Sequence, residues 1–132
     1  MTILACGLVL PEYNSAMPLS ATIENLPKGI AIVTLSGGLT LGTSLKIADT
    51  QIQAAIEDGV TKMVIDLTDV EYADSAGLGM LMYTYGTLNE KKGSLRLCGL
   101  SPRVMSLLQM TKTDALLTID RNREESLAAL RA

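Results

Sequence analysis

The hydrophobic positions of the chain first mark out two neighbouring strands. Residues 21–23 and 30–35 alternate or run apolar and are rich in β-branched side chains, a pattern typical of strands. The segment Asn25–Gly29 between them contains asparagine, proline and glycine, which favour turns. The pattern therefore predicts a β-hairpin.

An amphipathic helix and a buried strand come next. Apolar residues recur at intervals of three and four over residues 43–58, and Gly59 stands where such a helix would end. Met63–Leu67 is a short apolar run that contains Asp66 near its end. Such a run is typical of a strand buried on both faces. We therefore expect this strand at the centre of the sheet.

The second half of the chain alternates helix and strand patterns. After a loop expected over residues 68–74, the apolar spacing predicts a helix that starts near Ser75 and ends near Lys91–Gly93. Ser101–Pro102 is a typical helix start, and Asn122 with Glu125 forms a capping pattern for a final helix. Short strands are expected at residues 94–98 and 116–119.

This order of elements predicts an α/β fold, with a mixed β-sheet of four to five strands and about four α-helices packed on it. The length of 132 residues suits a single domain. Strand-like sequence follows Met17 directly, so we expect a domain over residues 17–132, with residues 1–16 forming either an N-terminal extension or an upstream start. No export signal is expected there, because no basic segment precedes the apolar residues.

Composition narrows the range of functions. The chain has no histidine, which removes the commonest general base and zinc ligand and every Ser-His-Asp or Cys-His arrangement. Phenylalanine and tryptophan are also missing and the net charge is −3, so neither stacking platforms nor a basic stripe for nucleic acid is available. No apolar run approaches the roughly 20 residues that cross a bilayer. We expect a cytoplasmic protein without metal, cofactor, nucleic acid or membrane partner.

The two cysteines carry no redox or metal motif. Cys6 and Cys98 lie far apart without a Cys-x-x-Cys spacing, and Cys98 belongs to an apolar, strand-like run. A reduced and buried thiol is therefore expected at Cys98.

The segment Asp74–Gly79 is unusual because it places Gly77 and Gly79 in the first turns of a helix. Glycine in a helix costs about 1 kcal/mol relative to alanine. These glycines therefore indicate a backbone that is approached closely, either by the sheet beneath it or by a partner above it. On the same helix Met80 and Tyr83 point away from the core stripe. They form either an exposed docking patch or a surface that another helix covers.

Ser75 lies at the start of this helix, where the simplest interpretation is that Asp74 or Ser75 caps it. A phosphate on Ser75 would add nearly two negative charges at the positive end of the helix, which the fold can accept. A partner docked on the same helix face would meet that charge beside Asp74, with Asp69 and Glu71 close in sequence, and would be repelled. The setting predicts that phosphorylation of Ser75 turns an interface off.

From Leu19 to its C-terminus the sequence resembles the STAS domain family, the sulfate-transporter and anti-sigma-factor-antagonist family. The resemblance rests on Leu35–Leu39, on Ile65–Leu67 leading into Asp-Ser-Ala-Gly-Leu-Gly at 74–79, and on Ser101–Pro102. It implies an antagonist that binds an anti-sigma factor of the serine-kinase type and thereby releases a sigma factor. The kinase would switch the antagonist off by phosphorylating Ser75, and a serine phosphatase would reset it.

The resemblance and the helix pattern together predict a partner-binding surface around the switch residue. Its expected members are Asp74, Ser75, Ala76, Gly77, Gly79, Met80, Tyr83 and Thr40. Thr40 stands where the family commonly has an aspartate, and a threonine cannot supply that carboxylate. This departure leaves a second function open, namely a STAS interaction module that is not phosphorylated and belongs to a signalling scaffold or a lipid-transport accessory complex.

Two other functions are disfavoured. Ala73–Gly77 partly imitates the Gly-x-Ser-x-Gly nucleophile elbow, but it lacks the first glycine, and the chain has neither a histidine nor a Ser-x-x-Lys motif. Neither a Walker A sequence nor Gly-x-Gly-x-x-Gly is present to bind a nucleotide. We therefore expect a binding protein rather than an enzyme.

Overall fold

The computed structural model describes residues 18–132, so the expectations for Cys6 and for residues 1–16 lie outside the described part. The described chain starts with the predicted hairpin. Strand β2 (Ser20–Leu26) pairs antiparallel with β3 (Ile30–Leu39), and the short turn η1 (Pro27–Gly29) joins them. Lys28 and Gly29 have φ values of 68° and 75°, which lets three residues reverse the chain.

Two crossovers then add parallel strands to this hairpin. Helix α1 (Thr43–Glu57) leads to β4 (Lys62–Ala73), which runs parallel to β3. Helix α2 (Ser75–Glu90) leads to β5 (Ser94–Cys98), which runs parallel to β4. Both helices and both strands match the predicted positions, except that β4 is longer than expected.

The last third of the chain contains helix α3 (Pro102–Met110), the turn η2 (Thr113–Ala115), strand β6 (Thr118–Asp120) and helix α4 (Arg123–Arg131). The predicted caps are present: the Ser101 side chain accepts the amide of Val104, and that of Asn122 accepts the amide of Glu125. The strand expected at 116–119 was placed too early. Leu116 and Leu117 instead directly follow the η2 turn, and both of their amides donate to the Thr113 carbonyl.

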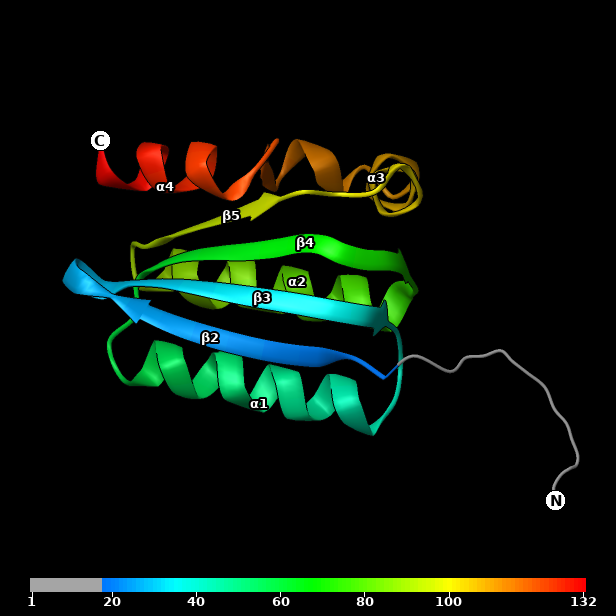
Figure 1. Cartoon of the computed structure of the whole chain (residues 1–132), viewed down its shortest axis with the longest axis horizontal. Coiled ribbons are helices and arrows are strands. Elements are labelled where there is room, and N and C mark those ends of the chain that lie inside the picture. The colour runs from blue at the N-terminus through cyan, green and yellow to red at the C-terminus, as the bar shows by residue number, and fades with distance from the viewer. Residues whose placement is uncertain (1–17) are drawn as a thin grey trace, which may run out of the picture.

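Within residues 18–132 the strands form one five-stranded mixed sheet in the order β2-β3-β4-β5-β6, accompanied by four α-helices. The predicted fold class and the central place of β4 are confirmed. Alternate residues of β3 enter two different clusters: Ala31 and Val33 pack under α1 and α2, whereas Ile30 and Ile32 pack with Leu130 of α4. The helices therefore cover both faces of the sheet, and α3 lies near the end of β4 (Figure 1).

Strand β4 continues through the segment that was expected to be a loop. The expectation of a loop over residues 68–74 was wrong up to Ala73, because residues 69–73 pair with Ser36–Leu39 of β3. Strand β5 stops pairing at Asp66, so beyond that point β4 has β3 on one side and contacts α3. Register shifts at Thr34/Ser36 and Gly37/Gly38 mark bulges in this ribbon. The extended β3–β4 ribbon carries the chain to Ser75.

Polar contacts attach α4 to the second face of the sheet. Arg123 donates to Asp66 Oδ2 at 3.0 and 3.2 Å and to Thr34 Oγ1 at 2.7 Å. Arg96 of β5 makes a bidentate pair with Asp120 of β6 at 2.7 and 3.0 Å. Ser126 of α4 donates to Asp120 Oδ2 at 2.6 Å and so connects this pair to the helix. We call these contacts the α4 seam, defined by Thr34, Asp66, Arg96, Asp120, Arg123 and Ser126.

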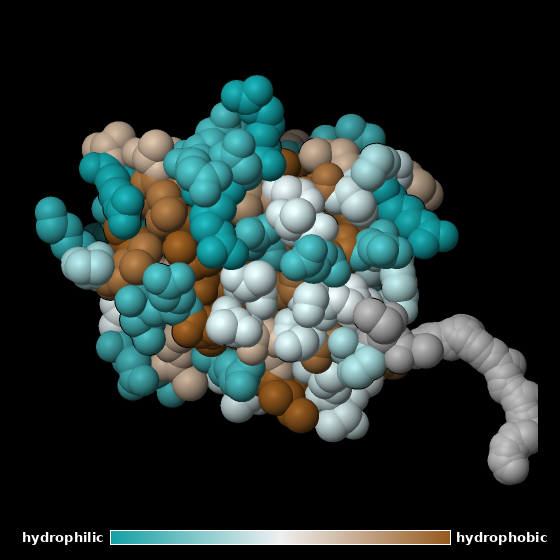
Figure 2. All heavy atoms as spheres, viewed as in Figure 1, coloured by the Kyte–Doolittle hydropathy of each residue, from teal (hydrophilic) through white to brown (hydrophobic). Residues whose placement is uncertain are grey.

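Beside the α4 seam lies the smaller of the two apolar clusters. Figure 2 shows hydrophobic surface gathered between α4 and the hairpin turn on this face. The cluster consists of Ile30, Ile32, Val64, Cys98 and Leu130. Cys98 is a free, buried thiol, as predicted, and burial raises its pKa to about 12.

Candidate functional site

Helix α2 starts at the carboxyl ends of two parallel strands, β3 and β4 (Figure 1). Strand β4 ends at Ala73, Asp74 follows, and α2 starts at Ser75. Strand β3 ends at Leu39, whose carbonyl accepts the amide of Asp74 at 3.1 Å. The start of α2 is therefore attached directly to the end of β3.

Asp74, rather than Ser75, caps the helix. One carboxylate oxygen, Oδ1, accepts the Gly77 amide at 3.0 Å, the usual bond of an N-cap residue. The other oxygen, Oδ2, accepts the Leu41 amide at 3.0 Å. Ser75 is the first helical residue and its side chain is exposed. The hydroxyl of Ser75 is therefore not needed for capping and is accessible to a partner.

The two glycines of this segment have different surroundings. Gly77 is buried against the end of β3, and a Cβ added there would collide with the backbone carbonyl of Leu39. Gly79 is exposed and a Cβ there would meet nothing. Of the two explanations offered by the sequence, close approach of the sheet therefore applies to Gly77. Gly79 leaves open backbone on the outer side of the helix.

Helices α1 and α2 form a shallow groove next to Ser75. Its volume is about 240 Å³, and it is lined by Leu45, Lys46, Asp49, Ala76, Gly79, Met80 and Tyr83. The prediction that Met80 is an exposed anchor was wrong: its exposure is only 6%, because its side chain joins the core cluster to which α1 also contributes. The alternative of a covering helix is correct for Met80. Tyr83 is 62% exposed, which agrees with its predicted place on the solvent face.

The segment between β3 and α1 completes the site. Thr40 follows β3 directly and is half-buried, whereas Leu41 is 74% exposed. Leu41 was not among the predicted site residues, although a leucine between a strand end and a helix start, next to Gly42, is a recognisable signal in the sequence. The structure brings it to Asp74 through the hydrogen bond to Oδ2. We call the surface formed by Thr40, Leu41, Ser75, Gly79 and Tyr83 the α2 surface.

On the segments that lead to this surface, acidic side chains outnumber basic ones. Asp74 is half-buried beside Ser75, and Asp69 and Glu71 are exposed on the last part of β4. Asp49 lines the groove together with the cationic Lys46. An added phosphate at Ser75 would therefore place its charge beside the Asp74 carboxylate, although the amino end of α2 would itself favour an anion.

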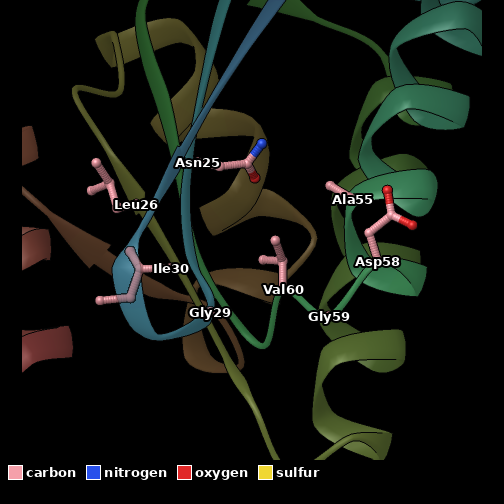
Figure 3. Close-up of a pocket in the computed structure, with 8 residues that line it drawn as sticks. All are labelled: Asn25, Leu26, Gly29, Ile30, Ala55, Asp58, Gly59 and Val60. Atoms are coloured by element: carbon pink, nitrogen blue, oxygen red, sulfur yellow. The ribbon is translucent and has the colours of Figure 1, made fainter.

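No group of three or more histidine, cysteine, aspartate or glutamate residues in residues 18–132 could hold a metal ion. A separate cavity of about 390 Å³ lies at the opposite end of the strands, between the hairpin and the end of α1 (Figure 3). Asn25 and Asp58 are its polar side chains, and none of the predicted site residues lines it. Among the described helices, none is both long and apolar enough to cross a membrane.

Comparison with known proteins identifies what the chain is similar to. The model of the STAS domain matches residues 24–126. The anti-sigma F factor antagonist of Paenibacillus polymyxa is 30% identical over 103 residues, which cover 78% of this chain and 88% of that protein.

Two solved structures with a similar fold represent one protein, SpoIIAA. Its unphosphorylated form matches with a TM-score of 0.75 and 20% identity, covering 85% of this chain and 96% of that one. The phosphorylated form of SpoIIAA from Bacillus matches with a TM-score of 0.68 and 18% identity, covering 83% and 98%. At these identities the two matches establish the fold.

Proposed function

Because the chain belongs to the STAS domain family, we propose that it is an anti-sigma factor antagonist that phosphorylation of Ser75 switches off. In its unmodified form it binds an anti-sigma factor of the serine-kinase type, and this binding releases a sigma factor. The kinase then phosphorylates Ser75, the complex separates, and a serine phosphatase restores the active form.

The observation that carries this proposal is that Asp74 caps α2 while the neighbouring Ser75 stays exposed. Asp74 accepts the Gly77 amide as the N-cap of α2 and also the Leu41 amide, so the exposed Ser75 hydroxyl is not needed to cap the helix. A kinase can therefore modify Ser75 without removing the N-cap. The first turn of a helix also favours an anion, because its amide groups and dipole present positive charge. Phosphorylation is thus compatible with an intact fold.

The same phosphate opposes binding of a partner. It carries a charge of about −1.5 to −2 at neutral pH, and it adds to the carboxylates of Asp69, Glu71 and Asp74. A partner that covers Ser75 would have to desolvate this charge, which is costly without a matching cation. The phosphate therefore acts on the interface and leaves the domain folded.

The partner surface that we propose contains most of the predicted residues. Ser75, Gly79 and Tyr83 are exposed on α2, and Asp74, Ala76 and Thr40 are half-buried around them. Gly77 and Met80 lie beneath the surface and contribute by holding α2 against β3 and α1.

The remaining features of the proposal follow from this role. Residues 17–132 form the functional domain and residues 1–16 an extension of it. The protein is a cytoplasmic binding protein and not an enzyme. The absence of histidine supports this assignment, because the exposed Ser75 has no histidine base to activate it.

Mass spectrometry tests the switch. The purified protein is incubated with ATP and the candidate anti-sigma factor kinase of the same organism, and intact mass and peptide maps are recorded, with Ser75→Ala as the matched control. We expect one phosphate, on Ser75, and none on the variant. If the kinase modifies a control antagonist but leaves Ser75 unmodified, the chain is instead a constitutive STAS interaction module, with Thr40 as the first residue to examine.

A further inference from the structure

Leu41 is an exposed leucine whose backbone is bonded to Asp74, the residue before Ser75. It lies in the three-residue segment between β3 and α1, and 74% of it is accessible to solvent. A single exposed leucine is ordinary on a protein surface. What distinguishes Leu41 is that its backbone amide is bonded to the residue immediately before Ser75.

Asp74 connects Leu41 to the start of α2. Its Oδ2 accepts the Leu41 amide and its Oδ1 accepts the Gly77 amide, both at 3.0 Å. Its own amide donates to the Leu39 carbonyl at 3.1 Å. Asp74 thus connects the segment between β3 and α1 to the first turn of α2, because each of its two carboxylate oxygens accepts an amide from one of them. The backbone of Leu41 is held in this way, so it needs little further ordering when a partner binds the side chain.

The surroundings of Leu41 continue as one surface along α2. Ser75, Gly79 and Tyr83 are spaced by four residues and therefore share a helix face. All three are exposed, and the open backbone at Gly79 lets a partner approach closely between the larger side chains. The surface thus runs from Leu41 past Ser75 to Tyr83.

The charges next to this surface indicate the chemistry of its partner. Asp74 lies directly before Ser75, and Asp49 and Lys46 line the neighbouring groove. Asp69 and Glu71 are exposed further back on β4, so the carboxylates of this region outnumber its cations. Complementary surfaces pair opposite charges and bury apolar side chains at their centre. The partner should therefore present an apolar pocket bordered by lysine or arginine.

We propose that Leu41 is an anchor for the anti-sigma factor, which receives it in such a pocket, and that Asp74 is its positioning residue. This inference rests on the proposed function and adds to it a contact residue and the chemistry of the partner surface. Ser75 then lies between the two exposed side chains, Leu41 and Tyr83, so a phosphate there keeps the partner from burying either of them.

Calorimetric titration of the purified candidate anti-sigma factor kinase, with ADP in place of ATP so that no phosphate is transferred, tests the anchor. We expect Leu41→Ala to bind about tenfold to a hundredfold more weakly than the unmodified protein, the value of burying one leucine side chain. Met110→Ala is the control, because Met110 is 81% exposed at the end of α3, and we expect it to retain full affinity. Added salt should weaken binding.

Asp74→Asn tests the positioning role. The amide oxygen of asparagine can still cap Gly77, but its nitrogen cannot accept the Leu41 amide. We expect faster hydrogen exchange at the Leu41 amide and weaker binding, with little further loss when Leu41→Ala is added to Asp74→Asn. A merely structural role of Asp74 would give additive losses, and that result would overturn its assignment as a positioning residue.

Failure of this inference can be distinguished from failure of the proposed function. If the unmodified protein binds the kinase and Leu41→Ala, folded by circular dichroism, binds equally well, the anchor is refuted while the proposed function stands. If the unmodified protein does not bind, both are overturned. If Leu41→Ala changes self-association in sedimentation without changing kinase binding, the leucine contacts a second copy of the chain and the inference is wrong.

Discussion

Asp74 and Ser75 are adjacent residues with separate tasks at the start of α2. Asp74 holds the Gly77 and Leu41 amides with its two carboxylate oxygens, and Ser75 presents its hydroxyl to solvent. Losing an N-cap costs about 1 kcal/mol, so a phosphorylated N-cap residue would couple the switch to stability. Placing the serine one position later separates the two.

Gly77 and Gly79 allow a matched pair of substitutions. A Cβ at residue 77 collides with the Leu39 carbonyl, whereas a Cβ at residue 79 meets nothing. We expect Gly77→Ala to lower the free energy of unfolding by about 1–3 kcal/mol, the cost of overpacking. Gly79→Ala should raise it by about 0.5–1 kcal/mol, because alanine favours the helix. Urea unfolding of both variants measures the difference, and equal effects would contradict the packing described for Gly77.

At the scale of single residues the sequence singled out the segment 74–79 but could not rank its members. Both glycines stood out by the same helix propensity, and only the position of β3 separates them. Met80 and Tyr83 both lay off the core stripe, yet Met80 joins the buried cluster to which α1 contributes, whereas Tyr83 is exposed. The neighbours that decide these cases come from distant parts of the chain, so spacing within α2 could not reveal them.

The α4 seam attaches helix α4 to the sheet through polar side chains. Helix α4 is held to the sheet by Arg123, which bonds to Asp66 and Thr34, as well as by Leu130. We expect Arg123→Ala to lower the free energy of unfolding by about 1–3 kcal/mol, because it leaves the buried Asp66 carboxylate without its cation. Arg121→Ala is the control, since Arg121 pairs with Glu125 on the surface and should have little effect. Equal losses in chemical unfolding would show that the α4 seam contributes nothing beyond a surface ion pair.

The same seam makes the fold sensitive to acid. Burial alone would raise the pKa of Asp66, but hydrogen bonds from Thr68 and Arg123 outweigh it and hold that pKa below its ordinary value of 3.8. The bond from Arg96 likewise lowers the pKa of Asp120. Carboxylates with lowered pKa stabilise the fold above their ordinary pKa and lose that contribution as the pH falls through the folded value.

We therefore expect the free energy of unfolding to fall between about pH 5 and pH 2. Asp66→Asn should be less stable at neutral pH and should lose less stability over this range. Urea titrations at a series of pH values measure the slope. An Asp66→Asn variant with the same slope as the unmodified protein would exclude Asp66 as a source of the acid sensitivity.

At the scale of helices and strands, the predictions were correct where a signal within a few residues determined the structure. The caps at Ser101 and Asn122 and the glycine after α1 were readable because each acts within a few residues. The second half of β4 was not, because Thr68 and Asp69 are polar and exposed like loop residues. Its strand conformation comes from pairing with Ser36–Leu39, more than thirty residues earlier.

At the scale of the whole molecule, the alternation of strands and helices was enough to predict a mixed sheet covered by helices. The arrangement brings the ends of β3 and β4 together at the start of α2, and no single element of the sequence shows that meeting point. The proposed switch residue, Ser75, is therefore placed by topology, while its proposed chemistry is local.

The most direct test of the central claim is the affinity of the candidate anti-sigma factor for the protein in its two states, measured by calorimetry with unmodified and Ser75-phosphorylated protein. We predict that only the unmodified form binds, that Ser75→Ala binds like it, and that Ser75→Asp is weakened at least tenfold. Equal affinity for the unmodified, phosphorylated and Ser75→Asp forms would contradict the account of Ser75 as the switch.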